Sequence, residues 1–191
     1  MKTRTFIAIA VSEEVRAGAM RAIERLRGLA PSFRWVAEEN LHYTLHFLGD
    51  LTDQEIVNVC DRVERAAGSF ASFALQATGI GAFPSLERPR TLWIGAGQGG
   101  EQVAGLQAAI GEQLLDLGFR GENRRYVPHL TIGKLSGRGG RPPAGLTSQL
   151  AELTDLQAGS MLVDQVTVFA SQLHRDGPEY QVLARCDLSG P

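Results

Sequence analysis

The sequence predicts an α+β fold with two pseudo-symmetric lobes, each an antiparallel sheet with helices on its outer face, and an active-site cleft between them. Strand and helix patterns alternate in the same order twice along the chain. A short motif also recurs, because His42 and His129 stand 87 residues apart and each is followed two residues later by a threonine. The same offset maps Ile7 onto Ile94. We therefore expect one bilobal domain over residues 1–191, built from an internal repeat.

The first repeat alternates apolar runs, typical of strands, with apolar residues at helical spacing. Ser12 and the two glutamates behind it are typical of a helix start, and Pro31 ends that helix. The expected elements are a strand over 5–11, a helix from Ser12 to Leu29, an extended segment over 33–36, a strand over 41–48, a helix after Thr52, a strand over 73–80 and a loop over 84–89.

The same order restarts near Thr91, and the aromatic series Phe6, Trp93 and Tyr180 keeps the 87-residue step twice. Four glycines and two prolines between Ser136 and Gly145 predict a mobile loop there. The expected elements are a strand over 91–95, a turn over 97–100, a helix over 103–117, a connector over 120–127, a strand over 129–135, a short helix over 146–153, and strands over 161–169 and 180–186.

The composition is that of a soluble globular protein, with 43% hydrophobic and 21% charged residues. No apolar run approaches the roughly 20 residues that a membrane span requires, and the N-terminus lacks a signal-peptide core. We expect a cytoplasmic monomer without a membrane association or an obligate protein partner. Cys60 and Cys186 have no metal-ligand or redox spacing, which favours buried thiols.

The net charge of −2 argues against a protein that binds nucleic acid through overall positive charge. Basic residues nevertheless concentrate around the second histidine motif, where Glu122 is the one acid. This stretch favours an anionic substrate, although a solvated loop would have the same composition. Its six basic residues are Arg120, Arg124, Arg125, Lys134, Arg138 and Arg141.

Alternation along a strand places a histidine and the threonine two residues later on one face. His42 with Thr44, and His129 with Thr131, would therefore meet in one cleft if the lobes face each other. One imidazole can act as base and the other as acid near neutral pH, and the hydroxyls can donate to phosphoryl oxygens. The four side chains match what in-line attack at phosphorus requires.

Two other interpretations of the motif remain open. A single His-x-Thr on a strand is common and is usually structural, but packing does not require both residue types on the polar face of both copies. A zinc site is the sharper alternative, since imidazoles are common ligands. Only Asp50 and His46 offer a third ligand, at no fixed spacing, so we expect neither a metal nor another cofactor.

The segments His42–Gly49 and Pro128–Ile132 resemble the paired signatures of the 2H phosphoesterase superfamily. Within it, the chain is similar to the RNA 2′,3′-cyclic phosphodiesterases, historically called 2′-5′ RNA ligases. The resemblance covers nearly the whole chain and includes the segments 6–9, 34–42, 79–84 and 92–95.

The resemblance implies hydrolysis of an RNA 2′,3′-cyclic phosphate to a 2′-phosphomonoester without metal or nucleotide. His42 would be the proton donor and His129 the proton acceptor, while Thr44 and Thr131 would hold phosphoryl oxygens; pseudo-symmetry alone leaves the two histidine roles exchangeable. The reverse reaction would be a weak 2′-5′ ligation. Hydrolysis of small cyclic nucleotides or 2′-5′ oligonucleotides, and binding of RNA or nucleotides without turnover, are the alternatives.

Four flanking residues are candidate substrate contacts. His46 stands where the family usually has a basic Lys or Arg, and Lys134 stands where it favours Arg. Simple alternation puts Lys134 on the face opposite His129, so it would have to reach around the strand end. Tyr126 matches an aromatic family position and would either stack on a base or pack in the interior. Arg125 adds a charge beside it.

Overall fold

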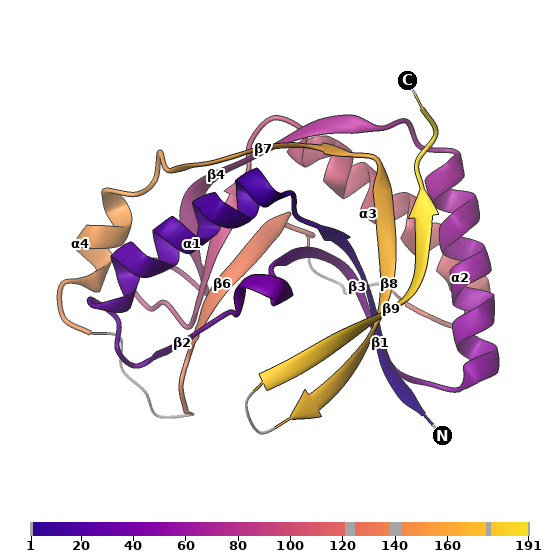
Figure 1. The fold of residues 1–191 in the computed structure, drawn as a ribbon, viewed down its shortest axis with the longest axis horizontal. Helices are drawn as coiled ribbons and strands as arrows, with labels where there is room; N and C mark the ends of the chain where they lie inside the picture. Colours follow the sequence, from indigo (N-terminus) through magenta and orange to yellow (C-terminus); the bar gives the residue numbers. More distant parts are fainter. Residues whose placement is uncertain (1, 121–124, 138–142, 175–176, 191) are drawn as a thin grey trace.

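The computed structural model describes residues 2–120, 125–137, 143–174 and 177–190. Strands and helices alternate largely as the sequence predicts (Figure 1). The strands are β1 (Thr3–Ala10), β2 (Phe33–Trp35), β3 (His42–Leu51), β4 (Phe73–Phe83), β5 (Thr91–Ala96), β6 (His129–Leu135), β7 (Gln157–Val163), β8 (Gln165–His174) and β9 (Gly177–Asp187). The α-helices are α1 (Glu13–Arg27), α2 (Asp53–Gly68), α3 (Gly100–Leu114) and α4 (Leu146–Ala151), and the 3-10 turns are η1 (Glu38–Asn40) and η2 (Leu115–Leu117).

The described strands form one curled antiparallel sheet in the order β7-β4-β5-β6-β3-β1-β8-β9, with β2 paired to β6. Strands β3, β1, β8 and β9 make up its first half, and β6, β5, β4, β7 and β2 its second half. The halves join where Tyr43 of β3 pairs with Leu130 of β6. The predicted α+β fold with two related halves is thereby confirmed, although the two expected sheets are joined into one.

Each half of the sheet combines strands from both repeats. Strand β4 ends the first repeat in sequence, yet it pairs with β5 and β7 of the second. Strand β8 lies in the second repeat and pairs with β1 of the first. The two repeats therefore exchange a strand, which is why neither half of the chain is a complete lobe.

One predicted strand is divided in two. The pattern over 161–169 predicts a single strand, but β7 ends at Val163 and β8 begins at Gln165, and the two strands lie in opposite halves of the sheet. The backbone carbonyl of Asp164 between them accepts a hydrogen bond from the amide of Leu188. An apolar run does not reveal such a break, because the buried side chains on both sides of the corner are equally apolar.

Three of the four α-helices begin where the sequence predicts, whereas α3 begins at Gly100, three residues before the expected start and inside the expected turn. The Ser12 hydroxyl accepts from the Val15 amide, and Thr52 forms a reciprocal capping box with Glu55. Helix α1 packs against β7, while α2 packs against α3 and β9. Figure 1 shows α1 and α4 toward one end of the molecule and α2 and α3 toward the other. No helix in the described part of the chain is long and apolar enough to cross a membrane.

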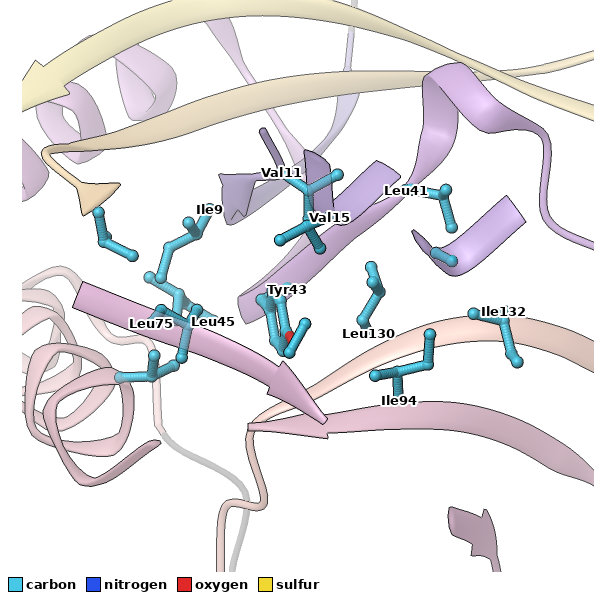
Figure 2. Packing of buried hydrophobic residues seen from close by; sticks show 14 of the residues in the cluster. Ile9, Val11, Val15, Leu41, Tyr43, Leu45, Leu75, Ile94, Leu130 and Ile132 are labelled. Atoms are coloured by element: carbon cyan, nitrogen blue, oxygen red, sulfur yellow. The ribbon is translucent and has the colours of Figure 1, made fainter. Parts of the chain in front are cut away.

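One continuous apolar core lies between the sheet and the helices. Close to its middle, the fully buried Tyr43 lies among Ile9, Leu45, Leu130 and Ile94 (Figure 2). The core thus runs beneath the junction of the two sheet halves, and it fixes the position of both strands that carry a histidine motif.

Candidate active site

The two His-x-Thr motifs occupy the first three residues of β3 and of β6. In both strands the histidine and threonine are partly exposed, while the residues between and after them are buried. This is the alternation of a half-buried strand. We call the side of the sheet that carries His42, Thr44, His129 and Thr131 the histidine face; the core lies against the other side.

The strand register brings the four side chains together. Because β3 and β6 run antiparallel and pair at Tyr43 and Leu130, the residues on either side of this pair are placed crosswise. His42 lies across from Thr131, and Thr44 lies across from His129. The charge of His129 acts on the His42 ring, as expected of groups that share one site. Each imidazole therefore has the hydroxyl of the other repeat beside it.

Both imidazole rings are oriented by the same hydrogen bond. The Nδ1 atom of His42 lies 2.7 Å from the carbonyl oxygen of Asn40, and Nδ1 of His129 lies 2.7 Å from that of Val127. A carbonyl oxygen can only accept, so Nδ1 carries the proton in each neutral ring. Nε2 is then left with a lone pair, and it is the atom that can exchange a proton with a substrate.

Aromatic side chains support each ring. Phe6 lies 5.0 Å from His42 between ring centroids, and Tyr180 meets His42 edge-on at 5.4 Å. Around His129, Phe83 meets the ring edge-on at 5.0 Å and Trp93 lies at 6.2 Å. None of these was a predicted site residue. The sequence did contain a signal for three of them, since Phe6, Trp93 and Tyr180 follow one another at the same 87-residue spacing as the two histidines.

The environment of both histidines favours the neutral ring. Burial lowers the pKa of His42 to about 4, opposed by the hydrogen bond to Asn40 and reinforced by the charges of Lys134 and His129. Burial also lowers the pKa of His129, with a further lowering by Lys134. No acidic side chain of the described residues contributes to either shift. The site is therefore suited to receive an anion.

A β-bulge at the same position of both repeats corrects the prediction for Lys134. In β6, Thr131 pairs with Trp93 and Gly133 with Leu92, so Ile132 is an extra residue. The extra residue reverses the alternation beyond it, and Lys134 is brought to the histidine face. Its charge acts on both imidazoles. Lys134 does not need to reach around the strand end.

The matching bulge in β3 removes His46 from the site. Thr44 pairs with Ala8 and His46 with Ile7, so Leu45 is the extra residue. His46 turns toward the helices, where its Nε2–H donates to the Gln107 carbonyl of α3 at 2.7 Å. The structure thus gives this ring a partner in α3, and the substrate contact of His46 stays a prediction. Phe47, one residue further, turns to the histidine face instead, where its ring lies 6.1 Å from Phe6 and is 70% exposed.

Tyr126 and Arg125 lie beside the site rather than in it. The Tyr126 hydroxyl donates to the backbone carbonyl of Thr44 at 2.8 Å, and burial raises the pKa of this phenol. Its packing role, the second of the two predicted alternatives, is the one the contacts support. Arg125 is exposed and lines a pocket with Gly100 at the start of α3.

Half of the predicted basic stretch can be placed. Arg120 and Arg125 are exposed, and Lys134 lies on the histidine face. Arg124, Arg138 and Arg141, together with Glu122, fall outside the described residues, as does half of the loop predicted to be mobile. Among the described residues there is no group of three or more His, Cys, Asp or Glu side chains that could hold a metal ion.

The fold and this site define a phosphoesterase that presents one imidazole and one hydroxyl from each of two sequence repeats on one face of a sheet. The family model for LigT-like phosphoesterases matches the chain twice, over residues 9–93 and 94–180. The chain belongs to this family, and the resemblance to the 2H phosphoesterases is confirmed.

Similar proteins match over nearly their full lengths. The RNA 2′,3′-cyclic phosphodiesterase of Thermotoga maritima is 34% identical over 98% of this chain and 96% of its own length. That of Methanothermobacter thermautotrophicus is 32% identical over 94% and 96%. Among solved structures, a protein of Thermus thermophilus has a TM-score of 0.81 at 26% identity, covering 98% of both chains. E. coli LigT complexed with 3′-AMP has a TM-score of 0.76 at 25% identity, covering 98% of this chain and 99% of its own.

Proposed function

We propose that this protein hydrolyses the 2′,3′-cyclic phosphate at the 3′ end of RNA to a 2′-phosphomonoester, by acid and base catalysis with two histidines and without a metal. The observation that carries the proposal is the equal anchoring of His42 and His129, each with a free Nε2 on the histidine face. The names of the Thermotoga maritima and Methanothermobacter thermautotrophicus relatives support the same reaction.

The proposed reaction is a displacement at phosphorus. Nε2 of His129 accepts a proton from water as the water oxygen bonds to phosphorus. The bond from phosphorus to the ribose 3′ oxygen breaks, and Nε2 of His42 donates the proton that this oxygen takes up. Thr44 and Thr131 donate to the non-bridging oxygens, where negative charge increases. Their crosswise placement sets a hydroxyl beside each reacting imidazole.

The reaction begins with one protonated and one neutral ring. The lowered pKa values of the free site leave both rings neutral at pH 7. A bound phosphodiester places a negative charge beside both rings and raises their pKa values, so substrate binding favours uptake of the proton that the reaction uses. This rise in pKa matters most for His42, because its pKa in the free site is lowered to about 4 and the ring must be protonated to act as the acid.

Two side chains beyond the four central ones suit a nucleotide end. Phe47 and Lys134 occupy equivalent positions after the two bulges, and both lie on the histidine face. Lys134 supplies a positive charge to the phosphate, while the exposed ring of Phe47 offers an apolar surface on which a base can stack. The site thereby combines contacts for phosphate and for base.

The reverse reaction would form a 2′-5′ linkage from a cyclic phosphate and a 5′ hydroxyl through the same two histidines. Water competes with the hydroxyl at about 55 M, so hydrolysis dominates unless the two ends are held together. Ligation is therefore proposed only as a minor activity. An RNA with both ends held by a splint would reveal it.

A second candidate substrate is a small cyclic nucleotide, since E. coli LigT has been solved with the mononucleotide 3′-AMP. The test is to compare kcat/KM for a cyclic mononucleotide and for an RNA with the same terminal nucleotide. An advantage of RNA supports the main proposal, and equal values favour the small nucleotide. Stoichiometric binding of both without product would indicate a binding module.

A further inference from the structure

The short strand β2 extends the histidine face beyond Lys134. Arg34 of β2 pairs directly with Lys134 of β6, and Lys134 pairs on its other side with Thr91 of β5. Side chains of directly paired residues lie on the same face of a sheet. Phe33, the neighbour of Arg34, is buried on the core side, and Arg34 itself is exposed. Arg34, Lys134 and Thr91 therefore form one row of donors across the histidine face.

This row leads away from the reacting phosphate. Lys134 lies near enough to both imidazoles for its charge to act on them. Arg34 is one strand further out, a step of about 4.8 Å between backbones. Neither residue forms an ion pair with any residue of the described ranges. The row therefore provides two successive positive charges, as two successive phosphates of a nucleic acid strand require.

We propose that Arg34 binds the phosphodiester immediately preceding the terminal nucleotide and so makes the enzyme prefer RNA ends to mononucleotides. The inference rests on the proposed function, and it assigns Arg34 a role in substrate choice rather than in the chemical step. A guanidinium suits this role because its fork can donate two hydrogen bonds to one phosphate. A cyclic mononucleotide has no such phosphate and gains nothing from Arg34.

The test compares two substrates with the same terminal nucleotide, a cyclic mononucleotide and a cyclic-ended trinucleotide, at several salt concentrations. We expect Arg34→Gln to lower the ratio of their kcat/KM values, trinucleotide over mononucleotide, about tenfold, the size of one charged hydrogen-bond contact. For the trinucleotide, log kcat/KM falls as log salt concentration rises. In Arg34→Gln the slope of this line should be shallower than in the wild type by about 0.7, the contribution of one phosphate contact. Arg34→Lys should keep the slope.

A neutral methylphosphonate at the preceding linkage provides the matching change in the substrate. It should lower kcat/KM of the wild type and leave that of Arg34→Gln unaltered. Arg21→Gln, at an exposed position of α1, is the control and should alter none of these values. An equal loss on both substrates, or no loss on either, would overturn the inference. If the wild type hydrolyses neither substrate, the proposed function fails, and the salt slope of trinucleotide binding still decides the role of Arg34.

Discussion

Tyr43 of β3 and Leu130 of β6 face each other, fully buried, at the junction of the two sheet halves. This pair sets the crosswise placement of the two His-x-Thr motifs on the other side of the same strands. The Tyr43 hydroxyl also donates to the Gly95 carbonyl of β5 at 3.0 Å, which ties β3 to the opposite half. The geometry of the site therefore depends on a buried contact that touches no substrate.

The first prediction concerns this hydrogen bond. Tyr43→Phe keeps the ring but leaves the buried Gly95 carbonyl without its partner, and such a loss costs about 1–3 kcal/mol of folding free energy. Urea unfolding measures it. Tyr180→Phe is the control, because that hydroxyl is not bonded to a described residue and its loss should change stability by less than about 0.5 kcal/mol. Equal stability of wild type and Tyr43→Phe would show that the junction does not depend on the bond.

The second prediction concerns the two imidazoles. Replacing His42 or His129 with alanine should lower kcat for a cyclic phosphate about 10²- to 10⁴-fold, the usual contribution of a positioned acid or base. Both variants should remain folded, since both rings are partly exposed. His174→Ala is the matched control, because His174 lies at the end of β8 with 52% of its side chain exposed and should be dispensable. Turnover by either active-site variant at the wild-type rate would be incompatible with the mechanism.

The third prediction separates the donor from the acceptor. An aryl phosphodiester with a p-nitrophenolate leaving group needs no proton on departure, so the loss of the acid matters less. On this substrate His42→Ala should recover most of its lost activity, whereas His129→Ala should stay as impaired as on the cyclic phosphate. The opposite pattern would exchange the two roles, which the pseudo-symmetry of the site permits.

The fourth prediction is the pH dependence of kcat/KM, which reports the free enzyme. The reaction needs one neutral and one protonated histidine, and burial lowers the pKa of both, that of His42 to about 4. The profile should be a bell whose maximum lies below the ordinary histidine pKa of about 6.5, with kcat/KM falling about tenfold per pH unit on the alkaline side. NMR titration of the ring protons should show that His42 stays neutral well below the pH at which a free imidazole protonates. A maximum above about pH 7.5 would contradict the buried, cation-flanked site.

The repeat and its periodicity were sufficient to predict the fold class, the starts of α1, α2 and α4, and the four residues of the two motifs. They could not predict the bulges, since Leu45 and Ile132 are apolar in either register and only the pairing partner reveals an extra residue. The two bulges explain why Lys134 and Phe47 lie on the histidine face and why His46 does not. The exchange of β4 and β8 between the repeats could not be predicted from the sequence either, because strand order in a sheet depends on long-range packing.

The most direct test of the two-histidine mechanism is the product from an RNA ending in a 2′,3′-cyclic phosphate, incubated with the wild type in excess EDTA. We expect a 2′-phosphate, formed at the rate seen without EDTA, and formation about 10²- to 10⁴-fold slower with His42→Ala or His129→Ala. A 3′-phosphate would contradict the assigned leaving oxygen. Loss of activity in EDTA would contradict the mechanism itself.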